Sequence, residues 1–384
     1  MAPLAPLLFK RFTYSTHLGE WEFLLAPPPP DLVGVVEAFW MSRGHIAMLY
    51  EKIIPQSNVE LMFNLERPFG VPNRAPANRS FRRAWIAGMQ QEWLLVTPQY
   101  APSEPSYLLS VRMPPLGAYR VLDLPLGEIA HDVVELDEAL GAEVNRVHER
   151  IGNTADAGMQ LAILCDFVRC RLARSSARLH ADARIAVGAL AESHGAARIE
   201  DLCRSLGVSR KHLGTLFHDH VGLTPKAFAR VFRFRRAVDL VQKGRRLDWA
   251  RVALACGYYD QAHFNREFRE FAGMTPGEYC RALPGSCIAG AVLRIDGVPA
   301  AEDSLRWTMN GRTFRFEELV DEIGEWWFPT DSAVLSGEVP VKAGDAEHRV
   351  DVDLELYIPY IVIGENEVLH IEEHDTKTMK AVAA

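Results

Sequence analysis

The chain has 384 residues, of which 48% are hydrophobic and 24% charged, and its formal net charge at pH 7 is −8. This composition is ordinary for a soluble globular protein of about two or three domains, and no apolar run approaches the roughly 20 residues of a membrane-spanning helix. The first residues, MAPLAPLLFKRF, lack the basic start and cleavage site of a signal peptide, and the six cysteines form no CxxC pair. The sequence therefore predicts a protein of the reducing cytoplasm without a disulfide or zinc framework.

The first segment, residues 1–177, opens with short runs of β-branched, aromatic and aliphatic residues. These runs are HLGEWEFLL, NVELMFNL, AWIAGMQQEWLLV and SYLLSVRM, and proline-rich turns separate them. The pattern predicts a β-rich, barrel-like or sandwich domain. From about Leu136 the pattern becomes helical, with Leu161, Leu164, Phe167 and Val168 at helical spacing. We therefore expect helices to trail the β-structure.

This first segment could also hold a small molecule, because small β-barrels can enclose one. The candidate lining residues are Trp21, Trp40, Phe63, Trp85 and Trp93, although aromatic residues in such strands can equally be ordinary core. The histidines His17, His45 and His131 lie far apart in the sequence without an H-x-H pair. The segment therefore predicts neither a metal-dependent oxygenase nor a metal ligand, and its ligand-binding residues stay unassigned.

The second segment, residues 178–285, reads as helical and is basic. Residues 178–283 contain 18 lysines and arginines against 11 acids, a balance of +7, whereas residues 284–384 contain 8 against 20, a balance of −12. A basic module suits a polyanionic partner, whereas the acidic third segment could not bind such a partner itself.

Two stretches of this basic segment carry one pattern about fifty residues apart. They read SRKHLGTLFHDHVGLTPKAF from Ser209 and DQAHFNREFREFAGMTPGEY from Asp260. In each, a capping Ser or Asp precedes a helix with a buried apolar stripe, and an upstream glycine (Gly207 or Gly257) ends the helix before it. Two helices joined by such a turn predict a helix-turn-helix motif.

The residues between the two units, Pro225 to Lys243, predict a longer connecting helix. Thr224 and Pro225 have the residue types expected at a cap and a first helical position. Two helix-turn-helix units on a stiff connector can address successive major grooves, which lie roughly 34 Å apart on one face of a duplex. The duplication therefore predicts that a single chain reads a long DNA site.

The stretches LCRSLGVSRKHLGTLFHDHVGLTPKAF and VALACGYYDQAHFNREFREFAGMTPGEY resemble the AraC/XylS family of transcription regulators over about 100 residues. MPPLGAYRVLDLPLGEIAHDVVELDEALG is similar to the end of the cupin-like sensor domain of one subgroup. The resemblance implies an all-α double helix-turn-helix domain that binds double-stranded DNA, with a sensor or dimerisation domain before it. The candidate partners are double-stranded DNA, a small-molecule effector, RNA polymerase and a second copy of the chain. No cofactor and no membrane are implied.

The faces opposite the apolar stripes provide the candidate DNA-binding residues. We expect Arg210 and Lys211 to hold phosphates, and Thr215 to offer little beyond a methyl contact to thymine. In the second unit Gln and Asn suit adenine and Arg suits guanine. The predicted DNA-binding residues are Arg210, Lys211, Thr215, Gln261, Asn265, Arg266 and Arg269. The alternative for each is a solvated helix face.

The third segment, residues 286–384, is acidic and returns to β-patterns. RWTMNGRTFRF predicts a hairpin turning at Asn310 and Gly311, and RVDVDLELYI alternates with its acids mostly on one face. HIEEH, from His370 to His374, matches a zinc-protease pattern but lies in a strand-like stretch, so the sequence predicts no catalytic residue and no metal site. We expect a regulator and not an enzyme. The alternatives are an enzyme, with a metal-dependent third segment, fused to the DNA-binding module, and an acidic segment that masks that module.

Overall fold

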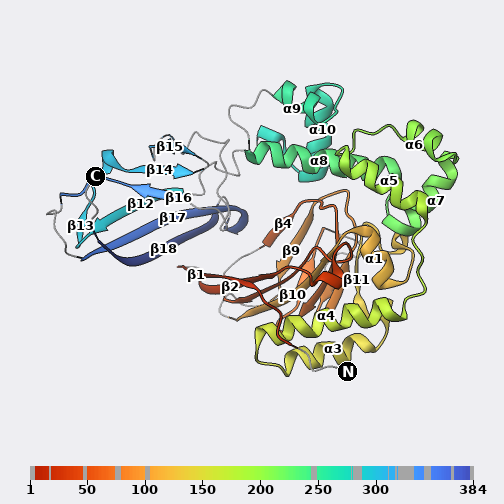
Figure 1. Ribbon diagram of the computed structural model, residues 1–384, viewed down its shortest axis with the longest axis horizontal. Helices are drawn as coiled ribbons and strands as arrows, with labels where there is room; N and C mark the ends of the chain where they lie inside the picture. Colours follow the sequence, from red (N-terminus) through yellow and green to blue (C-terminus); the bar gives the residue numbers. More distant parts are fainter. Residues whose placement is uncertain are drawn as a thin grey trace.

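The chain divides into a β-rich N-terminal region, a helical middle and a β-rich C-terminal region (Figure 1). The computed structural model describes residues 5–16, 19–45, 50–73, 79–99, 104–243, 249–277, 279, 288–309, 311–315, 318, 333–340, 347–364 and 367–380. The predicted order of β-rich, helical and β-rich regions is confirmed at this level.

The N-terminal strands form two sheets with antiparallel neighbours. They are β1 Lys10–Thr16, β2 Gly19–Ala26, β3 Ala38–Gly44, β4 Tyr50–Ile53, β5 Val59–Asn64, β6 Phe69–Val71, β7 Arg79–Phe81, β8 Ala84–Ala87, β9 Leu94–Pro98, β10 Ser106–Met113 and β11 Val133–Glu135. One sheet has the order β1-β2-β3-β10-β5-β8-β11, and β4-β9-β6-β7 belong to the other. The described strands do not close into a barrel, so the barrel-like shape expected from the sequence is replaced by two open sheets.

Helices trail these sheets, as predicted, but the first begins earlier than expected. They are α1 Pro115–Leu122, α2 Leu136–Leu140, α3 Glu143–Gly152 and α4 Ala157–Arg174, with short 3-10 turns η1 Pro30–Leu32 and η2 Leu126–Glu128. Pro115 occupies the first position of α1, where proline is well tolerated. The expected apolar positions of α4, from Leu161 to Val168, are buried.

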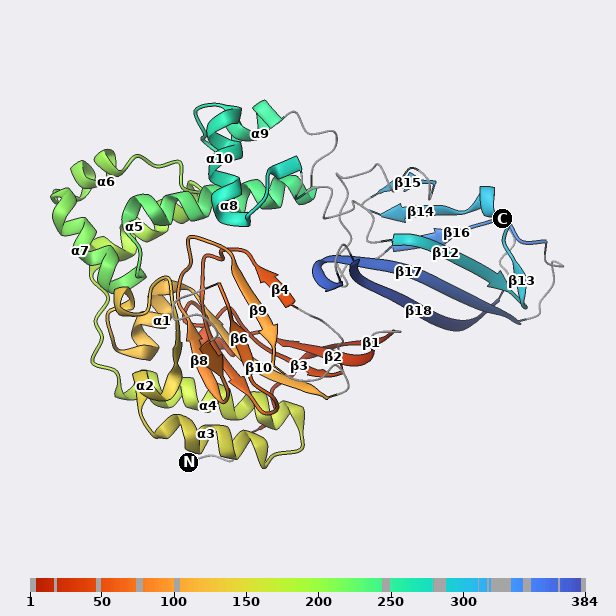
Figure 2. The ribbon, with the colours of Figure 1, turned by 180° about the vertical axis from the view of Figure 1, so that it is seen from behind.

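The helical middle comprises six helices among the described residues. They are α5 Ala181–Glu192, α6 Ile199–Leu206, α7 Arg210–Val221, α8 Pro225–Lys243, α9 Trp249–Ala255 and α10 Gln261–Ala272. Its core is rich in phenylalanine. The fully buried phenylalanine side chains of this region include Phe217, Phe228, Phe234, Phe264, Phe268 and Phe271. In both views α6 and α7 lie toward one end of α8, and α10 lies over the body of α8 (Figures 1 and 2).

The C-terminal region contains two sheets. Its elements are β12 Ile288–Ile295, β13 Val298–Pro299, η3 Glu302–Ser304, β14 Arg306–Met309, β15 Arg312–Phe314, β16 Ala333–Ser336, β17 Glu347–Gly364 and β18 Glu367–Lys380. The predicted hairpin is present as β14 and β15, with Met309 opposite Arg312; Asn310 lies outside the described residues. β17 also pairs with β4, with Ile361 opposite Glu51, so one sheet crosses from the C-terminal into the N-terminal region.

The alternation of β17 differs from the expected one wet and one dry face. Asp351 is only 7% exposed, because its carboxylate accepts hydrogen bonds from Arg349 Nε at 2.8 Å and from Thr376 Oγ1 at 2.7 Å. These hydrogen bonds, of which Thr376 contributes the largest effect, hold the pKa of Asp351 below its usual value. On the acidic face of this strand, Asp351 is therefore held by side chains of β17 and β18 and is not simply solvated.

Candidate nucleic-acid interface

The two repeated sequence units fold into two equivalent helices, α7 and α10. Each has 12 residues. The Ser209 hydroxyl accepts a hydrogen bond from the His212 backbone N–H at 3.1 Å, and the Asp260 carboxylate accepts one from His263 at 2.7 Å. Gly222 ends α7 with φ +85°, a left-handed conformation that suits glycine. Local capping therefore places both helices as the sequence predicted.

Each of these helices buries one stripe and leaves another outward. Leu213 and Phe217 of α7 are fully buried, as are Phe264 and Phe268 of α10. A helical stripe of this kind faces the core, and the residues between its members face away from it. The candidate DNA-binding residues lie in these outward positions on both helices.

In α7 the predicted residues Arg210, Lys211 and Thr215 are exposed. The Arg210 guanidinium is 70% exposed and pairs with Glu200 of α6 at 2.6 Å. The Thr215 hydroxyl donates to the Lys211 carbonyl oxygen at 3.2 Å, so this hydroxyl is used within the helix. Such an arrangement can position a phosphate backbone with Arg210 and Lys211, but offers few groups for reading bases.

In α10 the predicted residues Gln261, Arg266 and Arg269 are exposed, and Asn265 is half-buried. The helix thus carries one amide and two guanidinium side chains on its accessible surface, with a second amide partly accessible. These are the side-chain types that form paired hydrogen bonds with adenine and guanine edges in a major groove. The two helices therefore differ in chemistry, although their backbones are equivalent.

A buried ion-pair network that the sequence did not reveal fixes α10 on α8. The side chain of Glu267 is 5% exposed and accepts a hydrogen bond from Arg230 Nε at 2.7 Å. Arg233 Nη2 lies 3.7 Å from its other oxygen, and His263 Nε2 lies 3.8 Å away. Glu267 sits among phenylalanines in the sequence, and its neighbours come from a helix about thirty residues earlier, so only the tertiary structure identifies it.

The basic side chains of α8 are partly used inside the protein. Arg233 Nη1 donates to the carbonyl oxygen of Gly195 at 3.1 Å, and Arg235 lies 3.8 Å from Asp239. Burial lowers the pKa of Arg235, which is what desolvation does to a cationic group. Arg233 and Arg235 therefore have partners within the fold.

Both units pack on α8, whose 19 residues span about 28 Å at 1.5 Å per residue. The Phe217 ring of α7 lies 5.7 Å, centroid to centroid, from Phe228 near the start of α8. The Phe268 ring of α10 lies 5.1 Å from Phe234 at the middle of α8. The two units are therefore attached to one continuous helix.

The N-terminal region contacts α7 directly at its C-terminal end. The ring of Tyr119 in α1 lies 4.3 Å, centroid to centroid, from the ring of the buried His220. Gly222 packs so closely on η2 that a Cβ at this position would lie 2.8 Å from the Leu126 carbonyl oxygen. These contacts leave the N-terminal half of α7, with Arg210 and Lys211, exposed.

A cavity of about 370 Å³ lies in the N-terminal region. Its apolar lining includes Met62, Phe69, Val71, Phe81, Trp85, Leu94 and Val96. Of the predicted lining residues, Trp40 and Trp85 belong to it. Trp21 instead lines a cleft of about 890 Å³ together with His374. Phe63 is buried in the larger core. Trp93 is not among the residues that line the cavity, and its ring centroid lies 4.4 Å from Lys52 Nζ.

The cavity also contains polar groups that need partners. The indole Nε1 of Trp40 and the amide Oε1 of Gln90 are buried and have no hydrogen-bond partner among the residues that the structure describes. Arg112 Nε donates to Glu60 at 2.5 Å, and burial, with the Glu60 charge as a second cause, raises the pKa of Glu51 to about 7. An apolar chamber with a few convergent polar groups is what small-molecule sites usually offer.

Comparison with known proteins assigns each part of the chain. Residues 202–282 match a helix-turn-helix domain family, residues 25–135 match a domain family of unknown function, and residues 270–360 match the C-glycoside deglycosidase beta subunit family. The C-glycoside deglycosidase beta subunit of Arthrobacter globiformis is 74% identical over 100 residues, which are 26% of this chain and 76% of that protein. The helix-turn-helix region is of the AraC type, and the C-terminal part of the chain belongs to the C-glycoside deglycosidase beta-subunit family.

Two further similar proteins, both regulators, match this chain at lower sequence identity. An uncharacterized helix-turn-helix regulator of Haemophilus influenzae is 28% identical over 85 residues, which are 22% of this chain and 28% of that protein. The structure of ToxT from Vibrio cholerae O395 is 13% identical, with a TM-score of 0.36, and the match covers 63% of this chain and 96% of that one.

The expectation that the chain is not an enzyme is overturned by the C-terminal match. The 74% identity to one subunit of a deglycosidase shows that the C-terminal region is an enzyme-related domain. The motif that hinted at an enzyme, HIEEH, lies within strand β18 and not on the helix that the zinc-protease pattern requires. Within the described residues no helix is long and apolar enough to cross a membrane.

Proposed function

We propose that this chain is a sequence-specific transcription regulator that reads DNA with α7 and α10. The observation that supports this best is the pair of equivalent 12-residue helices, each capped by a side chain and packed on α8, and each with an exposed polar face. In the proposal α10 reads bases through Gln261, Asn265 and Arg266, while Arg269 of the same face adds a further contact. Arg210 and Lys211 of α7 hold phosphates, and Thr215 adds a methyl contact.

The test is selection of bound DNA from a random pool, followed by affinity measurements at several salt concentrations. We expect an asymmetric site, with strong base preferences in the half contacted by α10 and weak ones about one helical turn away. Arg266→Ala should relax one base preference, whereas Arg184→Ala, an exposed change on α5 outside both faces, should change none. Binding without any base preference would contradict the proposal.

The same proposal includes a small-molecule effector in the cavity of the N-terminal region. Unpartnered atoms on Trp40 and Gln90, beside an apolar wall, favour a ligand with an aromatic body and hydroxyl groups. Because the C-terminal relatives are named for C-glycosides, we propose an aromatic C-glycoside, or the aromatic part released from one, as this effector.

Calorimetric titration of the full chain with an aromatic C-glycoside, its aglycone and the free sugar tests this assignment. Trp40→Phe removes the Nε1 donor, shortens the aromatic side chain and should weaken ligand binding, whereas the matched change Trp21→Phe, outside the cavity, should not. Equal weakening by both variants, or no binding of any of the three compounds, would refute the assignment without touching DNA recognition.

A second function is favoured by the C-terminal match alone. We propose that residues 286–384 act as a deglycosidase subunit, so that one chain combines C-glycoside chemistry with gene control. The assay is release of sugar from an aromatic C-glycoside by the full chain, alone and mixed with the other subunit of the Arthrobacter globiformis enzyme. Absence of cleavage in both mixtures, while the Arthrobacter globiformis subunits together cleave the compound, would contradict this second function.

The masking alternative remains open to a direct test as well. β17 is hydrogen-bonded to β4, and the C-terminal strands lie away from α6 and α7 in both views (Figures 1 and 2). If the acidic segment masks the DNA-binding helices, removal of residues 286–384 should tighten DNA binding, and an unchanged affinity would count against masking.

A further inference from the structure

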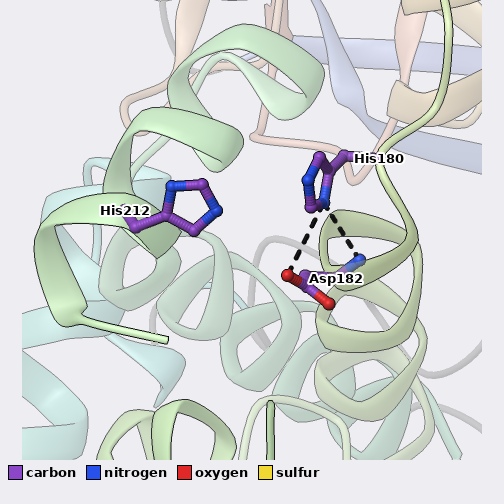
Figure 3. A group of neighbouring side chains, drawn as sticks. All are labelled: His180, Asp182 and His212. Atoms are coloured by element: carbon purple, nitrogen blue, oxygen red, sulfur yellow. Dashed lines mark hydrogen bonds and ion pairs between the residues drawn. The ribbon is translucent and has the colours of Figure 1, made fainter. Parts of the chain in front are cut away.

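Three metal-ligating side chains meet where the N-terminal region joins the helical middle. They are His180, Asp182 and His212, and one ligand atom from each lies within 4.8 Å of the others (Figure 3). The His180 Nδ1 lies 3.6 Å from the Asp182 carboxylate, and the rings of His180 and His212 are 5.7 Å apart, centroid to centroid. The sequence predicted no metal site, because His212 lies about thirty residues beyond the other two.

The fold holds each of these side chains from a different direction. His180 ends the connection between α4 and α5 and caps α5, since its Nδ1 accepts a hydrogen bond from the Asp182 N–H at 3.3 Å. The buried His220 accepts a hydrogen bond from the His180 backbone N–H at 3.2 Å and so fixes this connection on α7. His212 lies in the first turn of α7, whose start is set by the Ser209 cap.

The donor set has a clear chemical preference. Two imidazole nitrogens with one carboxylate suit Zn²⁺ and neighbouring divalent transition metals, whereas Mg²⁺ and Ca²⁺ prefer oxygen ligands alone. The side chains of His180 and Asp182 are 46% and 25% exposed, so they are free to turn the short distance needed to close on an ion, and solvent can supply a fourth ligand.

We propose that His180, Asp182 and His212 form a binding site for one Zn²⁺-class ion that clamps the interdomain connection to helix α7. The ion links His180 and Asp182, at the start of α5, to His212 in the first turn of α7. The same turn carries the exposed residues Arg210 and Lys211. Binding therefore reduces the freedom of α7 relative to α5. The site itself does not depend on DNA recognition; an effect of the ion on DNA affinity rests on the proposed function.

The first experiment is titration of the metal-free full chain with Co²⁺, followed by displacement with Zn²⁺, using visible absorption as the readout. We expect one site per chain, loss of the Co²⁺ signal on adding Zn²⁺ and no displacement by Mg²⁺. His180→Asn keeps a side chain that can cap α5. His180→Asn and His212→Gln, each as a single variant, should weaken Co²⁺ binding by at least the roughly 10–100-fold lost when a group that only hydrogen-bonds a metal ligand is removed. His194→Asn, an exposed histidine of the same region outside the cluster, should change nothing.

Binding that survives His180→Asn and His212→Gln, or that His194→Asn weakens equally, would overturn the site. Circular dichroism at 222 nm shows whether each variant retains its helices, so a lost signal in a folded variant counts for the site and not against the fold.

The clamp is tested separately by hydrogen exchange of the full chain with and without Zn²⁺. Amides of residues 180–184 and of α7 should exchange more slowly with the ion, and this protection should disappear in His212→Gln. Stoichiometric binding without such protection would overturn the clamp. A change of DNA affinity with Zn²⁺ that is absent in His212→Gln would extend the clamp to DNA recognition, whereas DNA binding without base preference would defeat the proposed function and leave the metal site standing.

Discussion

The ion-pair network around Glu267 leads to a specific prediction about the second recognition helix. Glu267 is nearly inaccessible and joins α10 to Arg230 and Arg233 of α8. Burial opposes the charge of Arg230, but hydrogen bonds to Glu267 and Glu270 outweigh it and raise the pKa of this guanidinium. Glu267→Gln keeps the shape of the side chain and removes the negative charge that the two buried guanidinium groups share.

The loss of unfolding free energy in Glu267→Gln depends on how much of the Arg230 and Arg233 charge is left without a partner. Removing one partner of a buried ion pair costs about 3–5 kcal/mol, and the retained contact of Arg230 with Glu270 at 2.7 Å places Glu267→Gln at the low end, about 3 kcal/mol. The matched control is Glu270→Gln, whose side chain is 47% exposed and which should cost no more than about 1 kcal/mol.

Urea unfolding followed by circular dichroism at 222 nm measures the helical region, because most other described residues are in strands or loops. Glu267→Gln should also weaken specific DNA binding more than Glu270→Gln, since α10 loses its attachment to α8. Equal destabilisation by the two variants would show that solvent, and not burial, sets the strength of this network.

Three further outcomes are expected. Gly222→Ala should destabilise the protein more than Gly207→Ala in urea unfolding, because both residues have positive φ but only Gly222 meets the η2 backbone, and equal losses would contradict the packing of η2 on α7. For Glu51, the native pKa of about 7 lies above its ordinary value of 4.5, so the folded state binds the extra proton and stability falls as pH rises through this window. Glu51→Gln should therefore lose less stability than the parent chain between pH 5 and pH 8, and an unchanged slope would refute this burial. Arg266→Ala should cost about 1–3 kcal/mol at one base position in a gel-shift titration, and an unchanged site preference would refute the assigned contact.

The helical region was predictable because its signals are local. The caps at Ser209 and Asp260, the glycines that end α6 and α7, and the apolar stripes all act within one or two turns of the chain. Residues within one turn determine a cap or a stripe, so the sequence alone placed both recognition helices and their outward faces.

The remaining features depend on contacts between distant segments, which periodicity does not record. Glutamate is a residue type usually found in solvent, but Glu267 is buried against α8. The open pair of sheets replaced the expected barrel, since closure depends on how edge strands meet. In the same way, His212 becomes a neighbour of His180 only when α7 folds back on the start of α5.

The shared sheet of β4 and β17 has a thermodynamic consequence. Glu51 lines the cavity and also stands opposite Ile361, so a single strand borders both the cavity and the deglycosidase-related region. If the proposed effector binds in the cavity and shifts β4 together with β17, a partner docked on the C-terminal sheet that makes the same shift changes the affinity of the effector. By reciprocity the effector then changes the affinity of that partner by the same factor.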